Sequence, residues 1–357
     1  IKILILICFT QMVELVANMI KTKYVRRRSA KISFLILGML VIALLSFNLR
    51  RPNFHKNSNF NVLDIKQSYS VALREISGIS AHYQNGGEID LTFVGDRYAK
   101  ILQAKFKSGV LEDIKLTDLT SLIIKKHAFC SSRVVPGCRK HMQSIVTQME
   151  GVAQDGGGRI FLLNEQLASI FVYDGNQLLS LINLNPGKTL KKKAHLENGF
   201  YEGLVLMNNG HLLTVKERDE ASIVEFGPEG GQARGYNQGL HIGGDQEFSL
   251  SSQRMSMLGL KMWHLGSDYR ACDLSEISSD QEGSLYVLSQ QCQFIARLKD
   301  LDPSNEQVDM DKLWTLPNEI LRAEAFVVLG PDLFLVAEDR KKMLSPSVFL
   351  VGLRDSV

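Results

Sequence analysis

The stretch Met149–Glu165 reads Met-Glu-Gly-Val-Ala-Gln-Asp-Gly-Gly-Gly-Arg-Ile-Phe-Leu-Leu-Asn-Glu, which is two short apolar runs on either side of a glycine turn. Apolar runs of this length around a turn of Gly, Asn and Asp predict a β-hairpin. The same opening glutamate, followed by a strand-like run, recurs at Glu75, Glu202, Glu276 and Glu324. Recurrence of one supersecondary unit predicts an array in which each copy buries its neighbour.

In three copies a second glutamate follows the turn, which gives the pairs Glu150–Glu165, Glu202–Glu217 and Glu324–Glu338. In a hairpin the residue numbers of any two paired residues add up to the same total. The midpoint of each of these glutamate pairs falls in its turn. The sequence therefore predicts that the two acids face each other at the strand ends away from the turn. Facing like charges are destabilising, so a cation, a basic neighbour or a raised pKa has to offset them. Solvated hairpin ends are the alternative for any single glutamate.

The spacing of the copies predicts the architecture. A four-stranded propeller blade takes about 40–50 residues, and all-β repeats of this size close into a β-propeller, which leaves no long exposed sheet edge. The longer spacings predict insertions or an additional strand pair, and we place the insertions over Val110–Val146 and Gly227–Asp268. We favour six blades, the last one closed by pairing of Val62–Leu73 with the C-terminal strand Ser347–Gly352. Five blades are the alternative.

The N-terminal part of the chain predicts a membrane anchor. Residues 32–49 carry no charge, and this run is long enough to cross a bilayer. Six Lys and Arg residues lie between 21 and 31 and three between 50 and 56, which predicts that the N-terminus lies inside and the rest outside. No small-x-small cleavage site follows, so we expect an uncleaved, single-pass signal anchor. A buried core helix is the alternative.

The anchor divides the chain into four expected parts. Residues 1–31 are a leader and basic cytoplasmic segment, 32–49 the anchor, 50–61 a tether and 62–357 the propeller. Residues 1–18 are apolar but interrupted by polar side chains, and the chain begins with Ile. We favour an over-extended reading frame there, with a true start at Met12 or Met19; a first membrane segment is the alternative.

Four of the five cysteines lie beyond the anchor, where an oxidising compartment favours disulfides. Cys130 and Cys138 enclose a short loop, and Cys272 and Cys292 are centred on the turn of the fourth hairpin. Pairing of 130 with 138 and of 272 with 292 is one of three possible connectivities.

The composition is that of an ordinary globular protein, with 357 residues of which 45% are hydrophobic and 22% charged. A net charge of +3 indicates no particular partner. A phosphate-binding loop and a Gly-x-Ser-x-Gly nucleophile elbow are both absent from the sequence. Nucleic-acid binding is not expected outside the cytoplasm, and the sequence does not indicate an oligomeric state.

The repeated motifs resemble those of the SdiA-regulated (YjiK-like) family of membrane-anchored bacterial β-propeller proteins. The motifs are Glu-Ile-Ser-Gly-Ile at 75–79, Met-Glu-Gly-Val-Ala at 149–153, Phe-Tyr-Glu-Gly-Leu at 200–204, Asp-Leu-Ser-Glu-Ile at 273–277 and Ala-Glu-Ala at 323–325. The resemblance covers roughly residues 60–353. It implies a propeller facing the periplasm or cell exterior from the bacterial inner (plasma) membrane, and relatives with phytase-like and esterase-like labels, but no established reaction.

This chain departs from the repeat at three places. Gln290 replaces the second acid of the fourth hairpin, Gly95-Asp96 stands there in the first, and Ala325 follows the last glutamate where glycine is usual. A fully symmetric site is therefore not expected.

If the glutamates begin the innermost strands, they ring one mouth of the central channel, where propellers commonly hold ligands. A cluster of carboxylates with few histidines suits Ca²⁺, which takes oxygen ligands. Our first hypothesis is a calcium-binding propeller. Its expected metal ligands are Glu75, Glu150, Glu165, Glu202, Glu217, Glu276, Glu324 and Glu338, with Asp96 beside them.

The second hypothesis is a metal-dependent phosphoesterase or esterase. Clustered carboxylates would hold the metal, and Lys216, Arg218 or Arg340 would hold an anionic substrate. The alternative for these basic residues is that they neutralise the acids. A third hypothesis is a scaffold that binds an envelope protein or a polysaccharide without metal.

Overall fold

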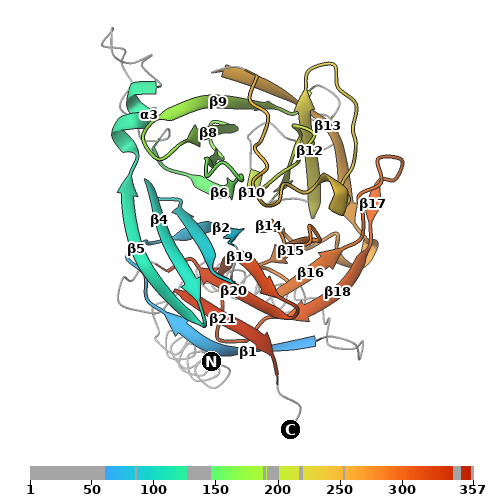
Figure 1. The fold of residues 1–357 in the computed structure, drawn as a ribbon. Helices are drawn as coiled ribbons and strands as arrows, with labels where there is room; N and C mark the ends of the chain where they lie inside the picture. The colour runs from blue at the N-terminus through green and yellow to red at the C-terminus, as the bar shows by residue number, and fades with distance from the viewer. Residues whose placement is uncertain are drawn as a thin grey trace, which may run out of the picture. The chain divides into compact units, whose positions relative to one another are not determined.

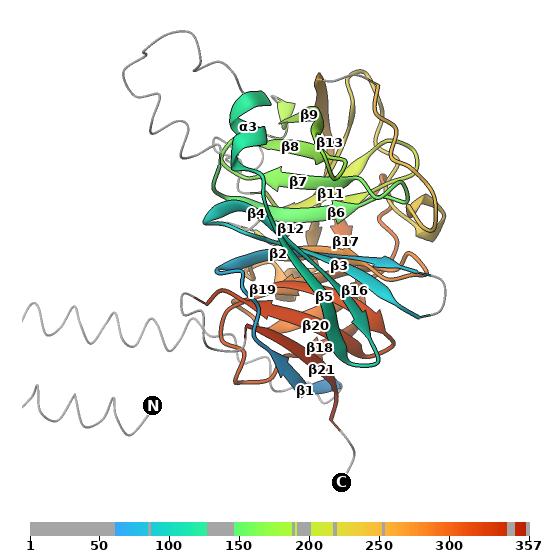
Figure 2. The same cartoon turned by 60° about the vertical axis from the view of Figure 1, so that its left-hand side comes forward.

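The computed structural model describes residues 61–84, 87–126, 146–187, 190, 201–216, 220–251, 254–340 and 347–354. These residues belong to one compact unit, Asn59–Val357, and most of them are in β-strands (Figures 1 and 2). The expectations for residues 1–58, for Cys130 and Cys138, and for Glu217 and Arg218 lie outside the described residues. Within the described ranges no helix has both the length and the apolar character that a membrane crossing requires.

The described strands form five antiparallel units of four strands each. The first is β2 (Ile76–Tyr83), β3 (Ile89–Gly95), β4 (Tyr98–Lys107) and β5 (Val110–Asp118). The second is β6 (Met149–Gln154), β7 (Ile160–Asn164), β8 (Ser169–Tyr173) and β9 (Leu178–Asn185). The third is β10 (Tyr201–Leu206), β11 (Leu212–Lys216), β12 (Ser222–Pro228) and β13 (Arg254–Leu265).

The fourth unit is β14 (Glu276–Ser279), β15 (Leu285–Ser289), β16 (Phe294–Leu298) and β18 (Met310–Thr315). The fifth is β19 (Ala323–Gly330), β20 (Leu333–Glu338), β21 (Val348–Leu353) and β1 (Asn61–Tyr69). Short additional elements are α3 (Thr120–Lys126), η3 (Gln238–Leu240), η4 (Ser267–Tyr269) and β17 (Gln307–Val308). Parallel pairs β9–β13 and β1–β18 join neighbouring units at their outer strands.

The first strand of each unit lies at the centre. β2 contacts β6, β6 contacts β10, β10 contacts β14, β14 contacts β19, and β19 contacts β2, which closes a ring around the middle of Figure 1. Strands β7, β8 and β11 are buried along their whole length. Strands covered on both faces have continuous apolar runs rather than an alternation, which explains Ile160–Leu163 and Leu212–Val215. The fold is therefore all-β and propeller-like, as predicted.

The N-terminal and C-terminal strands pair with each other, which confirms that prediction. β1 runs antiparallel to β21, from Leu63 opposite Leu353 to Tyr69 opposite Val348. This pairing supplies the fourth strand of the unit that β19 begins. Arg354 also binds Asp64 through two nitrogens, at 2.8 and 3.0 Å.

The two predicted insertions prove to contain regular strands. The range 110–146 begins with β5, the outer strand of the first unit, and 227–268 contains β13, the outer strand of the third. What interrupts the third unit is residues 229–251, called here the β12–β13 loop. β13 was missed because its sequence, Arg-Met-Ser-Met-Leu-Gly-Leu-Lys-Met-Trp-His-Leu, has neither strict alternation nor β-branched residues.

A buried carboxylate fixes the start of the β12–β13 loop. Glu225 is completely buried and accepts hydrogen bonds from the backbone N–H groups of Arg234, at 2.9 Å, and Gly235, at 3.0 Å. The His211 Nδ1 lies 2.6 Å from the same carboxylate. A buried charge is tolerated only when it is paired in this way.

A second buried carboxylate fixes the end of the loop. Asp155 is also completely buried; it accepts a hydrogen bond from Phe248 N at 3.0 Å and pairs with Arg159 at 2.6 Å. Between these anchors, Asn208 N donates to Leu240 O at 3.0 Å. The loop is therefore held by the second and third units together.

The predicted disulfide between Cys272 and Cys292 is present, with Cα atoms 5.7 Å apart. It links the segment before β14 to the turn between β15 and β16. This agrees with the prediction that the two cysteines face each other across the fourth hairpin.

Candidate functional site

Two of the repeated glutamates, Glu150 and Glu324, stand at β-bulges, and a bulge follows Glu202 in β10. In β19, Ala323 pairs with Glu338 and Ala325 with Ala337, so that Glu324 is the extra residue between them. The same shift occurs in β6 and separates Glu150 from Glu165. The predicted facing pairs are therefore wrong: an extra residue shifts the pairing at Glu150 and at Glu324, and Glu202 pairs with Val215.

The bulge position is not a glutamate in every unit. Ser77 is the extra residue of β2, because its neighbours Ile76 and Gly78 pair with consecutive residues of β3. Its Oγ donates to the carbonyl of Met149 in the second unit, and the Oγ of Ser275 donates to the carbonyl of Ala323 in the fifth, at 3.3 Å. Both carbonyls belong to the residue before a bulge glutamate. In unit one, serine therefore replaces the glutamate at the bulge, and Ser275, just before β14, makes the corresponding bond in unit four.

Carboxylates nevertheless gather at the end of the ring where the first strands begin. A cavity of about 200 Å³, called here the acidic cavity, is lined there by carboxylates from four of the five units and by residues that precede their first strands. Its carboxylates are Glu75, Asp96, Glu150, Glu165, Glu202, Glu324 and Asp339. Among its described lining residues Arg322 is the one basic side chain. Five predicted metal ligands thus come together, with Asp96 beside them.

The crowding of acids shows in the electrostatics. Burial, followed by the hydrogen bond and charge of Glu75 and the charge of Asp339, raises the pKa of Asp96 to about 7. Arg97 pairs with Glu75 at 3.1 Å, and Arg322 pairs with Asp339. Acidic side chains therefore outnumber basic ones among the described residues that line the cavity.

Glu338 does not line the acidic cavity. It is buried and accepts hydrogen bonds from Leu321 N at 3.0 Å and from the Arg340 Nε at 2.6 Å. Arg340 also lies over the ring of Phe349, 5.4 Å from its centroid. Lys216 is buried opposite Tyr201 on β10. Neither of these two predicted substrate-binding residues is among the described residues that line the cavity.

Glu276 lies inside the ring rather than at its mouth. It pairs directly with Leu288, in the register position that Gly151 holds in β6. The carboxyl accepts a hydrogen bond from Ile277 N at 3.0 Å, and the backbone N–H groups of Ile79 and Leu204 also bond to it. Burial raises the pKa of Glu276 well above its ordinary value, against the lowering effect of these backbone groups.

Glycines let the central strands approach closely around Glu276. A Cβ atom on Gly203 would lie 2.2 Å from the Glu276 Oε1, and Gly203 has a φ of +57°. A Cβ on Gly151 would lie 2.9 Å from the backbone of Gly203, and one on Gly78 would lie 3.0 Å from Gly151. In each Glu-Gly dipeptide of the repeat, the glutamate thus lines the acidic cavity, and the glycine allows the first strands to approach closely inside the ring.

The donor atoms of the acidic cavity suit a hard cation, but they are spread out. Among the residues that the structure describes, no three Asp, Glu, His or Cys side chains are placed to hold one metal ion together. A cation in the cavity would have to draw carboxylates from different units toward it.

The family can be assigned from the sequence of these repeats. The model of the SdiA-regulated family matches residues 138–338, which is more than half of the chain. The chain belongs to the SdiA-regulated family. No curated protein has a sequence that matches it.

Solved structures resemble this SdiA-regulated protein only distantly. The Malassezia sympodialis allergen Mala s 1 is 12% identical over 82% of each chain, with a TM-score of 0.43. A streptogramin B lyase is 10% identical over 82% of this chain and 97% of its own, with a TM-score of 0.38. Virginiamycin B lyase from Staphylococcus aureus is 9% identical over 82% of this chain and all of its own, also at 0.38.

Arg322, Asp339 and Gln148 line the acidic cavity and were missed from the sequence. Each lies one or two residues from a predicted glutamate, so position within the repeat was an available signal. Their residue types differ between the copies, and a search for recurring acids does not find them.

Proposed function

We propose that this SdiA-regulated protein is a membrane-anchored, extracytoplasmic β-propeller of five blades that binds a cation in the acidic cavity. The observation that carries the proposal is the cavity itself, whose described lining includes seven carboxylates and one arginine around about 200 Å³. Like charges held together in a partly buried site raise one another's pKa values, as at Asp96. A bound cation would relieve this repulsion.

Ca²⁺ is the ion to test first. The charged ligands available in the cavity are carboxylate oxygens, and Ca²⁺ takes six to eight oxygen ligands in flexible geometry. Glu150, Glu202 and Glu324 come from three different units. An ion that drew them together would therefore bridge units, and binding should stabilise the whole domain.

The blade count and the location are part of the same proposal. Five first strands that close a ring, with β1 completing the last unit, support five blades. The uncharged segment 32–49 with its basic flank supports an anchor in the inner membrane. The disulfide Cys272–Cys292 supports a domain in the periplasm or outside the cell, where such bonds persist.

The test is thermal unfolding of the full chain with Ca²⁺ and with a chelator. A ligand at one hundred times its Kd stabilises a folded protein by about 2.7 kcal/mol, so the melting temperature should rise with Ca²⁺. The double variant Glu150→Gln, Glu202→Gln should lose most of this rise. Glu229→Gln, on the exposed part of the β12–β13 loop, is the matched control and should keep it. An equal melting temperature of the unmodified chain in Ca²⁺ and in chelator would contradict the proposal.

A further inference from the structure

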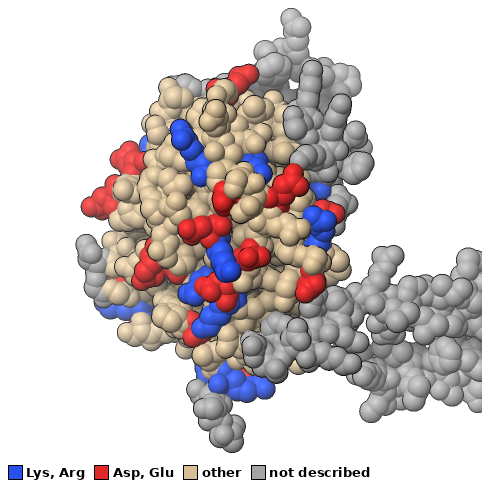
Figure 3. Space-filling model, turned by 90° about the vertical axis from the view of Figure 1, so that its right-hand side faces the viewer, with Lys and Arg blue, Asp and Glu red and all other residues tan. Residues whose placement is uncertain are grey.

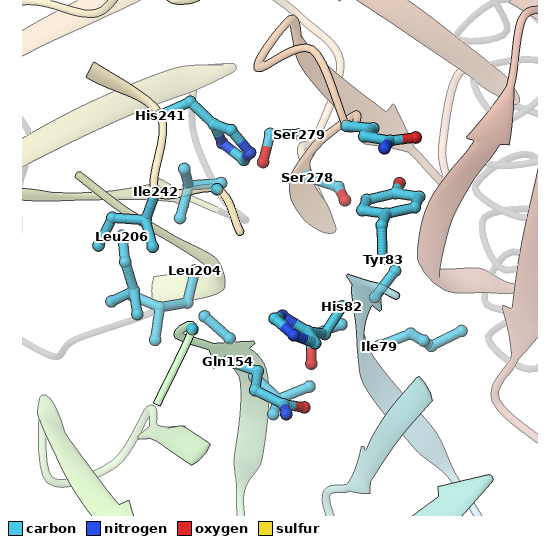
Figure 4. A pocket seen from close by; sticks show the side chains of 18 of the residues that line it. Ile79, His82, Tyr83, Gln154, Leu204, Leu206, His241, Ile242, Ser278 and Ser279 are labelled. Carbon is cyan, nitrogen blue, oxygen red and sulfur yellow. The ribbon is translucent and has the colours of Figure 1, made fainter. Parts of the chain in front are cut away.

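A second cavity lies at the opposite end of the central ring, where the first strands end. Its volume is about 240 Å³, and it is called here the distal cavity. Its walls are Ile79–Tyr83 of β2, 152–154 of β6, 204–206 of β10, 277–279 of β14 and 241–244 of the β12–β13 loop (Figure 4). It shares no lining residue with the acidic cavity.

The distal cavity differs from the acidic cavity in its chemistry. None of its described lining residues is Asp, Glu, Lys or Arg. Figure 4 shows Leu204, Leu206 and Ile242 on one side, with His241 beside Ile242, and Tyr83, His82 and Ser278 across the cavity from them. The labelled side chains with polar groups are His82, Tyr83, Gln154, His241, Ser278 and Ser279.

Two polar atoms in this lining lack a partner within the described protein. The Ser80 Oγ and the His241 Nδ1 are buried and accept or donate no hydrogen bond among the described residues, and Ser80 is only 8% exposed. A buried polar group without a partner costs free energy. Burial, against the charge of Asp280, lowers the pKa of His241, so its imidazole is neutral near pH 7. Both atoms are covered by protein at the edge of the cavity, so a hydroxyl of a neutral ligand would pair with them after a rotation of the Ser80 or His241 side chain.

The wall that carries His241 is held in place from three sides. Gly156 N donates to Gln246 O at 2.7 Å, and Asn208 N donates to Leu240 O at 3.0 Å. His241 packs against Gly283, where an added Cβ would lie 2.6 Å from the His241 Cβ. The turns of the second, third and fourth units thus support the loop. The cavity is preformed, which lowers the entropic cost of binding.

We propose that the distal cavity binds an uncharged, hydroxyl-bearing small molecule of about the size of one sugar ring. Its volume lies just below the range of about 300–1,000 Å³ that is typical of small-molecule sites. An anionic ligand would lose its hydration without meeting a Lys or Arg among the described lining residues, which is costly. Hydroxyl groups would pair with Ser80, His241 and Gln154, while a C–H face would pack on Leu204 and Leu206. This site is separate from the proposed cation site.

The experiment is saturation-transfer NMR of the full chain with D-glucose, N-acetyl-D-glucosamine and D-glucuronate as probes. At least one of the two neutral sugars should give a signal, and glucuronate should give a much weaker one. Ser279→Trp should fill the cavity and weaken the neutral sugar by about tenfold or more. His82→Ala, at a half-buried side chain, is a second variant with little risk to folding and should also weaken it.

The double variant Glu150→Gln, Glu202→Gln is the control, because it changes only the acidic cavity and should leave the sugar signal unchanged. Conversely, Ser279→Trp and His82→Ala should leave any effect of Ca²⁺ on melting unchanged, so that the two proposals can fail separately. The inference is overturned if neither neutral sugar gives a signal, if glucuronate binds as well as they do, or if a folded Ser279→Trp or His82→Ala variant binds like the unmodified chain.

Discussion

Glu276 illustrates how one substitution in a repeat changes the chemistry of the centre. The equivalent positions of β2, β6 and β19 hold Gly78, Gly151 and Ala325, which leave space there, and Gly203 of β10 lies against the Glu276 carboxyl. Glu276 fills that space with a carboxyl whose one oxygen meets backbone N–H groups. The other oxygen, Oε2, is buried and has no hydrogen-bond partner among the described residues. This side chain is therefore better suited to the protonated form than to the charged form.

The first prediction concerns Glu276 and pH. Its folded pKa is raised, so above the unfolded pKa of about 4.3 the unfolded chain ionises while the folded chain stays protonated. The free energy of unfolding should therefore fall as pH rises through this window. Glu276→Gln keeps the acceptor oxygen and removes the titration. Its stability relative to the unmodified chain should increase between pH 5 and pH 8, measured by urea unfolding.

The exposed Glu229→Gln variant is the control for this measurement, and its pH profile should match that of the unmodified chain. Parallel profiles for Glu276→Gln and the unmodified chain would show that the carboxyl does not titrate differently on folding.

At the scale of elements, the β12–β13 loop is an irregular segment that is held by side chains of the neighbouring strands and turns. Glu225 and Asp155 each bind loop N–H groups that have no strand partner. Tyr236, Ile242 and Phe248 are buried, so the loop also contributes to the core. These contacts place His241 and Ile242 at the distal cavity. The loop wall of that cavity therefore depends on Asp155, a side chain of the second unit.

The second prediction concerns Asp155. Asp155→Ala leaves Arg159 without its buried partner and Phe248 N without an acceptor, and breaking a buried pair costs about 3–5 kcal/mol. Hydrogen exchange at Phe248 and its neighbours should accelerate more than exchange in β7 and β8. Asp174→Ala, in the exposed turn between β8 and β9, is a matched control with a much smaller expected loss. Equal losses of stability in the two variants would contradict this role of Asp155.

At the scale of the whole domain, closure depends on the pairing of its two ends. β1 lies between β21 and β18 and therefore joins the fifth unit to the fourth. Leu63 is completely buried in this strand and packs in a cluster with Trp314, Phe334 and Val351. On the face drawn in Figure 3, acidic and basic side chains are interspersed. The contact that joins β1 to the fourth and fifth units at Leu63 is therefore apolar packing and not an ion pair on the surface.

The third prediction concerns closure. Leu63→Ala removes a fully buried side chain and should lower the free energy of unfolding by about 2–5 kcal/mol. Val62→Ala, the adjacent position with 39% exposure, should cost much less. Urea unfolding measures both. A similar small loss in both variants would show that β1 is not needed for closure.

Sequence patterns alone predicted the hairpins, the all-β repeat, the pairing of the terminal strands, the Cys272–Cys292 disulfide and the family. These features depend on local patterns, since a glycine turn between apolar runs defines a hairpin wherever it folds. The gathering of Glu75, Glu150, Glu165, Glu202 and Glu324 at one cavity also followed from their shared place in the repeat.

How neighbouring units meet is visible only in the folded domain. The bulges that separate Glu150 from Glu165 and Glu324 from Glu338, and the central position of Glu276, depend on backbone contacts between first strands. Arg322 and Asp339 reach the acidic cavity, and the β12–β13 loop forms the distal cavity, through contacts between residues far apart in the chain. Such contacts leave no periodic signal in one sequence, because each is made between units whose residues differ from copy to copy.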